Sequence, residues 1–124
     1  MTGLTFDTGA LIALERRKLR MRQVLERARE RDQAITVPAA VVAEWWRGPT
    51  DVRRAILDSV DVEPLTVRLA RIASEAMGAV PGSTLVDTIV MASAATRGDI
   101  VYSGDVHDLE RLRRVFPSVT ILGT

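Results

Sequence analysis

Four carboxylates occupy places in the sequence where chemistry is a reasonable expectation. Asp7 directly follows a short apolar segment, and Asp105 comes shortly after another. Glu44 and Asp87 each lie within a mostly apolar stretch. Because acids are seldom buried unless they are paired or bind a metal, all four are candidate site residues.

Three of these acids also have a purely structural interpretation. Asp7 and Asp105 stand where the N-cap of a following helix is expected. Asp87 lies three residues after Thr84, which is the spacing of a capping box. Taken one at a time, capping is the simpler interpretation of each.

Glu44 differs from the other acids because no capping role is open to it. An ion pair with Arg47 or Arg53 is its structural alternative. The sequence leaves both this pairing and a functional role open.

Most other catalytic schemes are excluded by residues that are missing. The sequence has no cysteine, and His107 is its only histidine, so thiolate zinc sites and two-histidine metal motifs are impossible. No Gly-x-Ser-x-Gly elbow or glycine-rich phosphate loop occurs. His107 is interpreted as a surface residue rather than a base.

Apolar patterning predicts strands that alternate with helices. Strands are expected at 4–6, 34–37, 60–62, 100–102 and 119–122, and helices at 8–14, 19–31, 39–46, 51–57, 66–79, 84–96 and 106–115. This alternation is typical of an α/β fold in which a parallel sheet of about five strands is covered on both faces.

Composition favours one compact domain in the cytoplasm. The chain has 124 residues, of which 47% are hydrophobic and 27% charged. Neither a signal peptide nor an apolar run long enough to cross a membrane is visible. The net charge of +1 does not argue for nucleic-acid binding, although the arginine-rich clusters 16–18, 53–54 and 111–114 could contact phosphates.

The four acids gain meaning when they are considered together. Asp7, Glu44 and Asp105 lie just beyond the carboxyl ends of different predicted strands, which share one edge of a parallel sheet. Asp87, in the first turn of its helix, can point to the same place. Converging carboxylates repel unless a cation lies between them, and oxygen ligands favour Mg²⁺ or Mn²⁺. The residues therefore predict metal-assisted phosphate chemistry, without identifying the substrate.

Four segments, in this order, resemble the motifs of PIN-domain nucleases. The first matches their opening Asp-x-Ser-Ala, the second and third their helical acids, and the fourth their closing Thr/Ser-x-Asp. They are Phe6-Asp7-Thr8-Gly9-Ala10, Val41-Val42-Ala43-Glu44, Leu85-Val86-Asp87-Thr88 and Ser103-Gly104-Asp105. The similarity covers nearly the whole chain.

The compact form resembles the VapC-type toxins of bacterial and archaeal toxin–antitoxin pairs. That resemblance implies a single PIN domain over residues 1–124, with a three-layer α/β/α fold and the strand order 3-2-1-4-5. It also implies an Mg²⁺- or Mn²⁺-dependent endoribonuclease that forms a homodimer and is inhibited by an antitoxin protein. The alternative is a catalytically inactive PIN-like module that only binds proteins; the presence of all four acids argues for the enzyme.

Two departures from the PIN pattern affect the expected site. Gly9 stands where the family usually has serine, so a helper hydroxyl is either missing or supplied by Thr8. In the last motif both Asp105 and Asp108 are available as the fourth acid. Asp105 is preferred because it lies nearer the strand end.

The adjacent Trp45 and Trp46 form the last candidate feature. Neighbours on a helix point about 100° apart, so both cannot be fully buried in one core. One interpretation is a core residue beside a boundary residue. The other is an exposed apolar groove for the antitoxin, bordered also by the predicted helix 19–31, because tryptophan is enriched in interface hot spots.

Overall fold

The computed structural model describes residues 2–124, which form five strands and seven helices. The strands are β1 (Leu4–Phe6), β2 (Ile35–Pro38), β3 (Asp61–Glu63), β4 (Ile100–Ser103) and β5 (Thr120–Gly123). The helices are α1 (Thr8–Glu15), α2 (Leu19–Glu30), α3 (Ala39–Trp45), α4 (Asp51–Asp58), α5 (Val67–Ala79), α6 (Leu85–Arg97) and α7 (Val106–Leu112). No helix in this part of the chain is both long and apolar enough to span a membrane.

All five strands belong to one parallel sheet with the order β3-β2-β1-β4-β5. The central strand β1 pairs with both β2 and β4, and its residue Thr5 lies opposite Thr36 and Val101. The predicted α/β class, strand number and order 3-2-1-4-5 are thus confirmed. Since the strands are parallel, their carboxyl ends lie along one edge.

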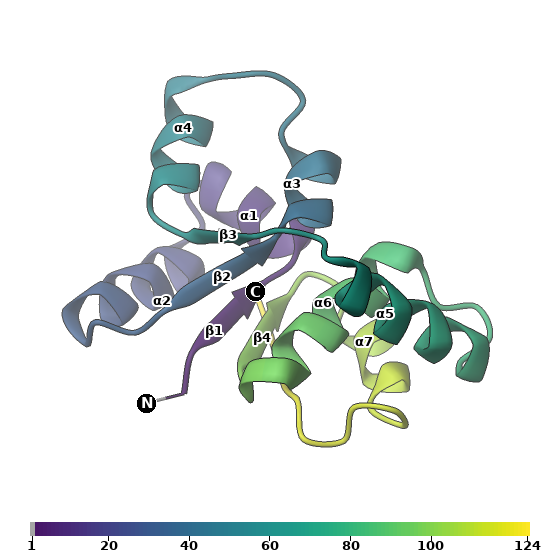
Figure 1. The fold of residues 1–124 in the computed structure, drawn as a ribbon. Helices are drawn as coiled ribbons and strands as arrows, with labels where there is room; N and C mark the ends of the chain where they lie inside the picture. The colour runs from purple at the N-terminus through teal and green to yellow at the C-terminus, as the bar shows by residue number, and fades with distance from the viewer. Residues whose placement is uncertain (1) are drawn as a thin grey trace.

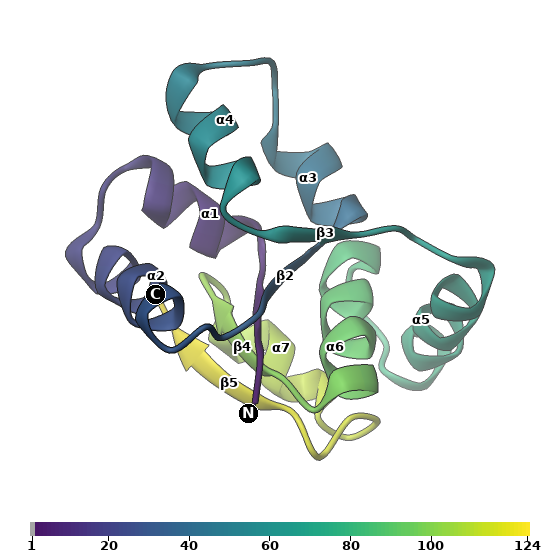
Figure 2. The ribbon, with the colours of Figure 1, turned by 60° about the vertical axis from the view of Figure 1, so that its left-hand side comes forward.

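Helices cover both faces of this sheet. Figure 2 shows α1 and α2 on one side and α5 and α6 on the other, with α7 packed against β5 and α6. In Figure 1, α1 and α3 lie next to each other beyond the carboxyl ends of the strands. This three-layer arrangement brings the starts of α1, α3, α6 and α7 to the same edge.

Helix ends follow from specific capping residues. Thr50, Thr66 and Thr84 accept hydrogen bonds from backbone N–H groups at the starts of α4, α5 and α6. Gly98 ends α6 in the left-handed conformation with φ 73°, as the sequence predicts. Helix α7 was expected to reach residue 115 but ends at Leu112, where a tighter turn leads to buried Phe116.

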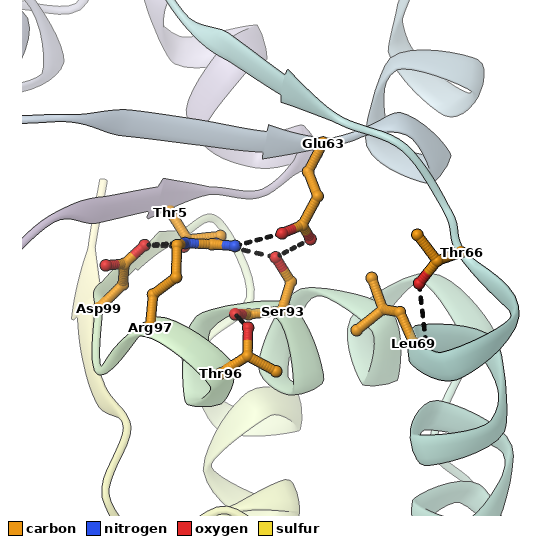
Figure 3. Close-up of polar contacts among 8 residues, drawn as sticks. All are labelled: Thr5, Glu63, Thr66, Leu69, Ser93, Thr96, Arg97 and Asp99. Atoms are coloured by element: carbon orange, nitrogen blue, oxygen red, sulfur yellow. Dashed lines mark hydrogen bonds and ion pairs between the residues drawn. The ribbon is translucent and has the colours of Figure 1, made fainter.

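A network of charged and polar side chains fixes α6 to the sheet (Figure 3). The guanidinium of Arg97 contacts Asp99 through Nε at 2.9 Å, Thr5 and Ser93 through one terminal nitrogen, and Glu63 through the other. Asp99 is buried and also accepts a 2.8 Å hydrogen bond from Thr5. Among the described residues, no buried side-chain nitrogen or oxygen lacks a partner. The network therefore links β1 and β3 to the helix that carries Asp87.

Candidate active site

Asp7 is held at the end of β1 by three hydrogen-bond donors. Its Oδ1 accepts the backbone N–H of Ala10 at 2.9 Å and that of Gly104 at 3.3 Å, and its Oδ2 accepts the hydroxyl of Ser103 at 2.5 Å. Burial raises the pKa of Asp7, and these hydrogen bonds offset part of the effect. Asp7 is therefore the N-cap of α1, and it also lines the hollow described next.

An acidic hollow opens at the carboxyl edge of the sheet. Its volume is about 270 Å³, and its lining includes Asp7, Asp87 and Asp105. Carboxylate oxygens of Asp87, Asp105 and Asp108 all lie within 4.8 Å of one another. Asp105 and Asp108, the two candidates for the fourth acid, therefore both lie close to Asp87 at the start of α6.

The charges in this hollow perturb one another. Burial raises the pKa of Asp87 to about 6, and the negative charges of Asp105, Asp7 and Asp108 add to the rise. The pKa of Asp105 is raised as well, chiefly by its hydrogen bond with the Asp108 side chain. A cation in the hollow would relieve this repulsion and return the carboxylates to their charged form.

Capping does not account for the acids at 87 and 105. At the start of α6 the side chain of Thr84 accepts the N–H of Asp87 at 3.2 Å, so threonine provides the cap. Asp105 makes no capping hydrogen bond to α7, and Ser103 accepts its N–H at 2.8 Å. Both carboxylates are left directed at the hollow, which is the outcome that a functional role requires.

Glu44 lies beside this hollow rather than in its lining. Its side chain is exposed, and its Oε1 accepts the hydroxyl of Thr8 at 2.5 Å. Neither ion pair expected as its structural alternative forms, because Arg53 pairs with Glu15 and Arg47 contacts only the Glu44 carbonyl. Thr8 links Glu44 to the acidic hollow, because Thr8 lines this hollow and also a neighbouring hollow whose lining includes Glu44.

Comparison with protein families identifies the domain that carries these acids. The PIN domain model matches residues 4–115, which include every acid described above. The chain belongs to the PIN-domain family. No curated protein matches it.

Solved structures share the fold of this PIN domain at low sequence identity. VapBC2 from Rickettsia felis, bound to a DNA fragment from its promoter, matches with a TM-score of 0.76, 11% identity and 98% coverage of both chains. DNA-bound VapBC from Salmonella typhimurium matches with a TM-score of 0.75 and 13% identity, with 99% of this chain and 98% of the other covered. A toxin–antitoxin complex from Klebsiella pneumoniae matches with a TM-score of 0.72 and 18% identity, with 95% of this chain and 96% of the other covered.

The glycine that replaces the usual PIN serine is explained by a close backbone contact. A Cβ added at Gly9 would lie 2.6 Å from the Cα of Gly104 and 2.8 Å from its nitrogen. A Cβ at Gly104 would in turn lie 2.9 Å from the Cα of Gly9. A serine at position 9 therefore does not fit this geometry, and the nearby hydroxyls come from Thr8 and Ser103.

Ser103 was identified from the sequence only as part of the closing motif, and its role in orienting Asp7 was not predicted. Its hydroxyl donates to Asp7 and accepts from the N–H of Asp105, so it joins the first and last motifs of the PIN domain. The available signal was its position at the end of β4, two residues before an acid. Its partner, however, lies 96 residues away in the chain.

The donor set of the acidic hollow fits a hard divalent cation. Asp7, Asp87, Asp105 and Asp108 offer carboxylate oxygens, which Mg²⁺ and Mn²⁺ prefer to nitrogen or sulfur ligands. The pKa of Asp87 is raised chiefly by burial and that of Asp105 chiefly by its hydrogen bond with Asp108, and in both cases nearby carboxylates add to the rise. The residues present are therefore suited to such an ion.

The two tryptophans of the PIN domain have different environments. Trp45 is 3% exposed, and its Nε1 donates to Glu15 at 3.0 Å, whereas Trp46 is half-buried. This corresponds to a core residue beside a boundary residue. Helix α2 lines one hollow with α1 and α4, whereas Trp45 lines another with Glu44 and residues of α1, so the groove between α2 and the tryptophan helix stays a prediction. Trp46 is the more exposed of the two and is therefore the antitoxin contact to be tested first.

Proposed function

We propose that residues 1–124 form a single PIN domain that acts as a metal-dependent endoribonuclease toxin. The observation that carries the proposal is the cluster of Asp87, Asp105 and Asp108 at the carboxyl edge of a PIN sheet, of which Asp87 and Asp105 line a hollow together with Asp7. This is the edge where open α/β sheets bind ligands. The raised pKa of Asp87 supports a role in chemistry, because such shifts concentrate at functional sites.

The proposed metal ligands are Asp7, Asp87 and Asp105, with Asp108 beside them and Glu44 reaching the site from α3. An Mg²⁺ or Mn²⁺ ion bound there supplies Lewis-acid stabilisation of charge on a phosphodiester. Ser103 fixes the orientation of Asp7 by donating to its Oδ2. Thr8 holds the exposed carboxylate of Glu44 toward the site by donating to its Oε1.

RNA and an antitoxin are the proposed partners on the grounds of similarity. The motifs resemble those of VapC-type toxins, and a solved structure with the same fold is a toxin–antitoxin complex. By the same reasoning we propose that the protein acts in the cytoplasm as a homodimer. An antitoxin that inhibits by occupancy would present an apolar anchor near Trp46 and an arginine to the carboxylates, because its planar fork can engage them and displace metal.

RNA cleavage by the purified protein tests the proposal. Activity should require Mg²⁺ or Mn²⁺ and stop with a chelator, and Asp87→Asn should lower it by orders of magnitude, since it removes a charged ligand but keeps the shape. The matched control is Asp58→Asn, an exposed acid on α4, which should retain full activity. Full activity of Asp87→Asn, with contaminating nuclease excluded, would overturn the mechanism.

A binding module without catalysis is the competing hypothesis. It predicts that the metal-loaded protein cuts no RNA and still binds the partner encoded next to it. No acid of the PIN pattern is missing at 7, 44, 87 or 105, which favours the enzyme. Sequencing of RNA ends after induced expression would separate the two hypotheses and also identify the target.

A further inference from the structure

A second hollow adjoins the acidic one. It has a volume of about 500 Å³ and is lined by residues of α1, by α3 with the turn that follows it, and by Arg53 of α4. Thr8 lines both hollows, and its hydroxyl donates to Glu44 at the boundary between them. The two hollows therefore meet at Thr8 and Glu44.

One arginine of the second hollow has a structural role. Arg53 donates through Nε to Glu15 at 3.0 Å, pairs with it again through a terminal nitrogen at 3.0 Å, and donates to the Gly48 carbonyl at 2.9 Å. The other oxygen of Glu15 accepts the indole N–H of Trp45 at 3.0 Å. The charges of Arg53 and Glu15 thus compensate each other, and this pair forms a fixed wall of the hollow.

Two other arginines of this hollow have no carboxylate partner among the described residues. Arg16 and Arg47 both line the hollow and are exposed, and in residues 2–124 neither forms a salt bridge. Arg47 makes a single long contact of 3.4 Å from Nε to the Glu44 carbonyl, so its terminal nitrogens have no bond to the protein. Its backbone has φ 49°, which costs a residue with a side chain more than glycine.

We propose that Arg16 and Arg47 form a phosphate-binding subsite for the RNA strand next to the bond that is cut. The inference rests on the proposed nuclease function and extends it to how the substrate is held. Exposed guanidinium groups without carboxylate partners suit phosphate oxygens, which they can bind through two parallel N–H groups. Contacts of this kind position a nucleic-acid strand without reading its sequence. The strand would pass Thr8, with one phosphate at the acids and neighbouring phosphates at the arginines.

Binding measurements on the full chain test this subsite. The double variant Arg16→Gln/Arg47→Asn removes both charges, and asparagine tolerates the positive φ at 47. In a chain already carrying Asp87→Asn, so that RNA stays intact, affinity for a short single-stranded RNA pool of randomised sequence should fall about tenfold, and the salt slope by roughly 1.4. The control Arg68→Gln/Arg71→Gln removes the same charge from two exposed arginines of α5, which form no salt bridge in residues 2–124, and should change neither.

Cleavage kinetics provide a second readout in chains with Asp87 intact. The Arg16→Gln/Arg47→Asn pair should raise KM for the RNA pool and leave cleavage of a dinucleotide unchanged, because a dinucleotide does not extend into the second hollow. If the wild type cleaves RNA and this variant binds and cleaves the pool like the wild type, the subsite is refuted while the nuclease proposal stands. Loss of antitoxin binding with unchanged RNA binding would also overturn it, because the hollow would then hold a protein. If the wild type neither binds nor cuts RNA, the nuclease proposal itself fails.

Discussion

Arg97→Met should be among the most destabilising single substitutions in this protein. Methionine keeps much of the aliphatic length of the side chain but removes every donor to Asp99, Glu63, Thr5 and Ser93. The side chain of Asp99 is 3% exposed, so its charge would lose an ionic partner where water cannot replace it. Breaking a buried pair in this way costs 3–5 kcal/mol, and because Arg97 itself is 28% exposed we expect about 3 kcal/mol.

Urea unfolding followed by circular dichroism measures the effect. With a slope of about 1.5 kcal/mol/M for a chain of this size, the midpoint should fall by roughly 2 M. Arg113→Met is the matched control, because Arg113 pairs with Glu110 at 3.4 Å on the surface and its loss should cost about 0.5 kcal/mol or less. Adding Asp99→Asn to Arg97→Met should recover part of the loss, since it removes the unpaired charge. A midpoint within the error of the control would refute the account of this network.

Three further predictions concern the site. The pKa of Asp87 is about 6 in the folded metal-free protein against 3.8 when unfolded, so the folded protein binds this proton more tightly. The stabilisation of the folded state by this proton is complete below about pH 4 and is lost above about pH 6. Without metal, Asp87→Asn should therefore raise the free energy of unfolding by about 2 kcal/mol more at about pH 7.5 than at about pH 4, and equal effects would contradict the shift. Gly9→Ser should destabilise by about 2 kcal/mol and reduce cleavage because it forces Gly104 away, whereas Gly78→Ser, with open space around it, should do neither in the same assays. Trp46→Ala should weaken antitoxin binding by about 2 kcal/mol in titration calorimetry, and unchanged affinity would move the docking surface elsewhere.

The order of elements and the edge that carries the acids were predictable because they depend on local patterns. Apolar periods and capping residues mark each strand and helix, and parallel pairing then brings the carboxyl ends of β1, β2 and β4 to one edge. Gly98 and Thr84 ended and began α6 as their chemistry requires. For these features neighbouring residues in the sequence contain the necessary information.

Long-range partners were not predictable from local patterns. Nothing near Arg53 indicates that it pairs with Glu15 rather than Glu44, because the choice depends on how α1 and α4 pack. The hydrogen bond from Ser103 to Asp7 and the presence of both Asp105 and Asp108 in the cluster likewise arise only when distant loops meet. A single sequence identifies the acids but not the groups that orient them.

The direct contact between Gly9 and Gly104 has a practical consequence for finding what this protein binds in cells. The spacing between the first turn of α1 and the turn after β4 is set by touching main chains, so it does not depend on the charge of the acids around it. A variant such as Asp87→Asn should therefore keep the shape of the hollow while no longer turning over what enters it. Expressed with an affinity tag, that variant would act as a trap from which captured RNA and protein can be recovered intact and identified.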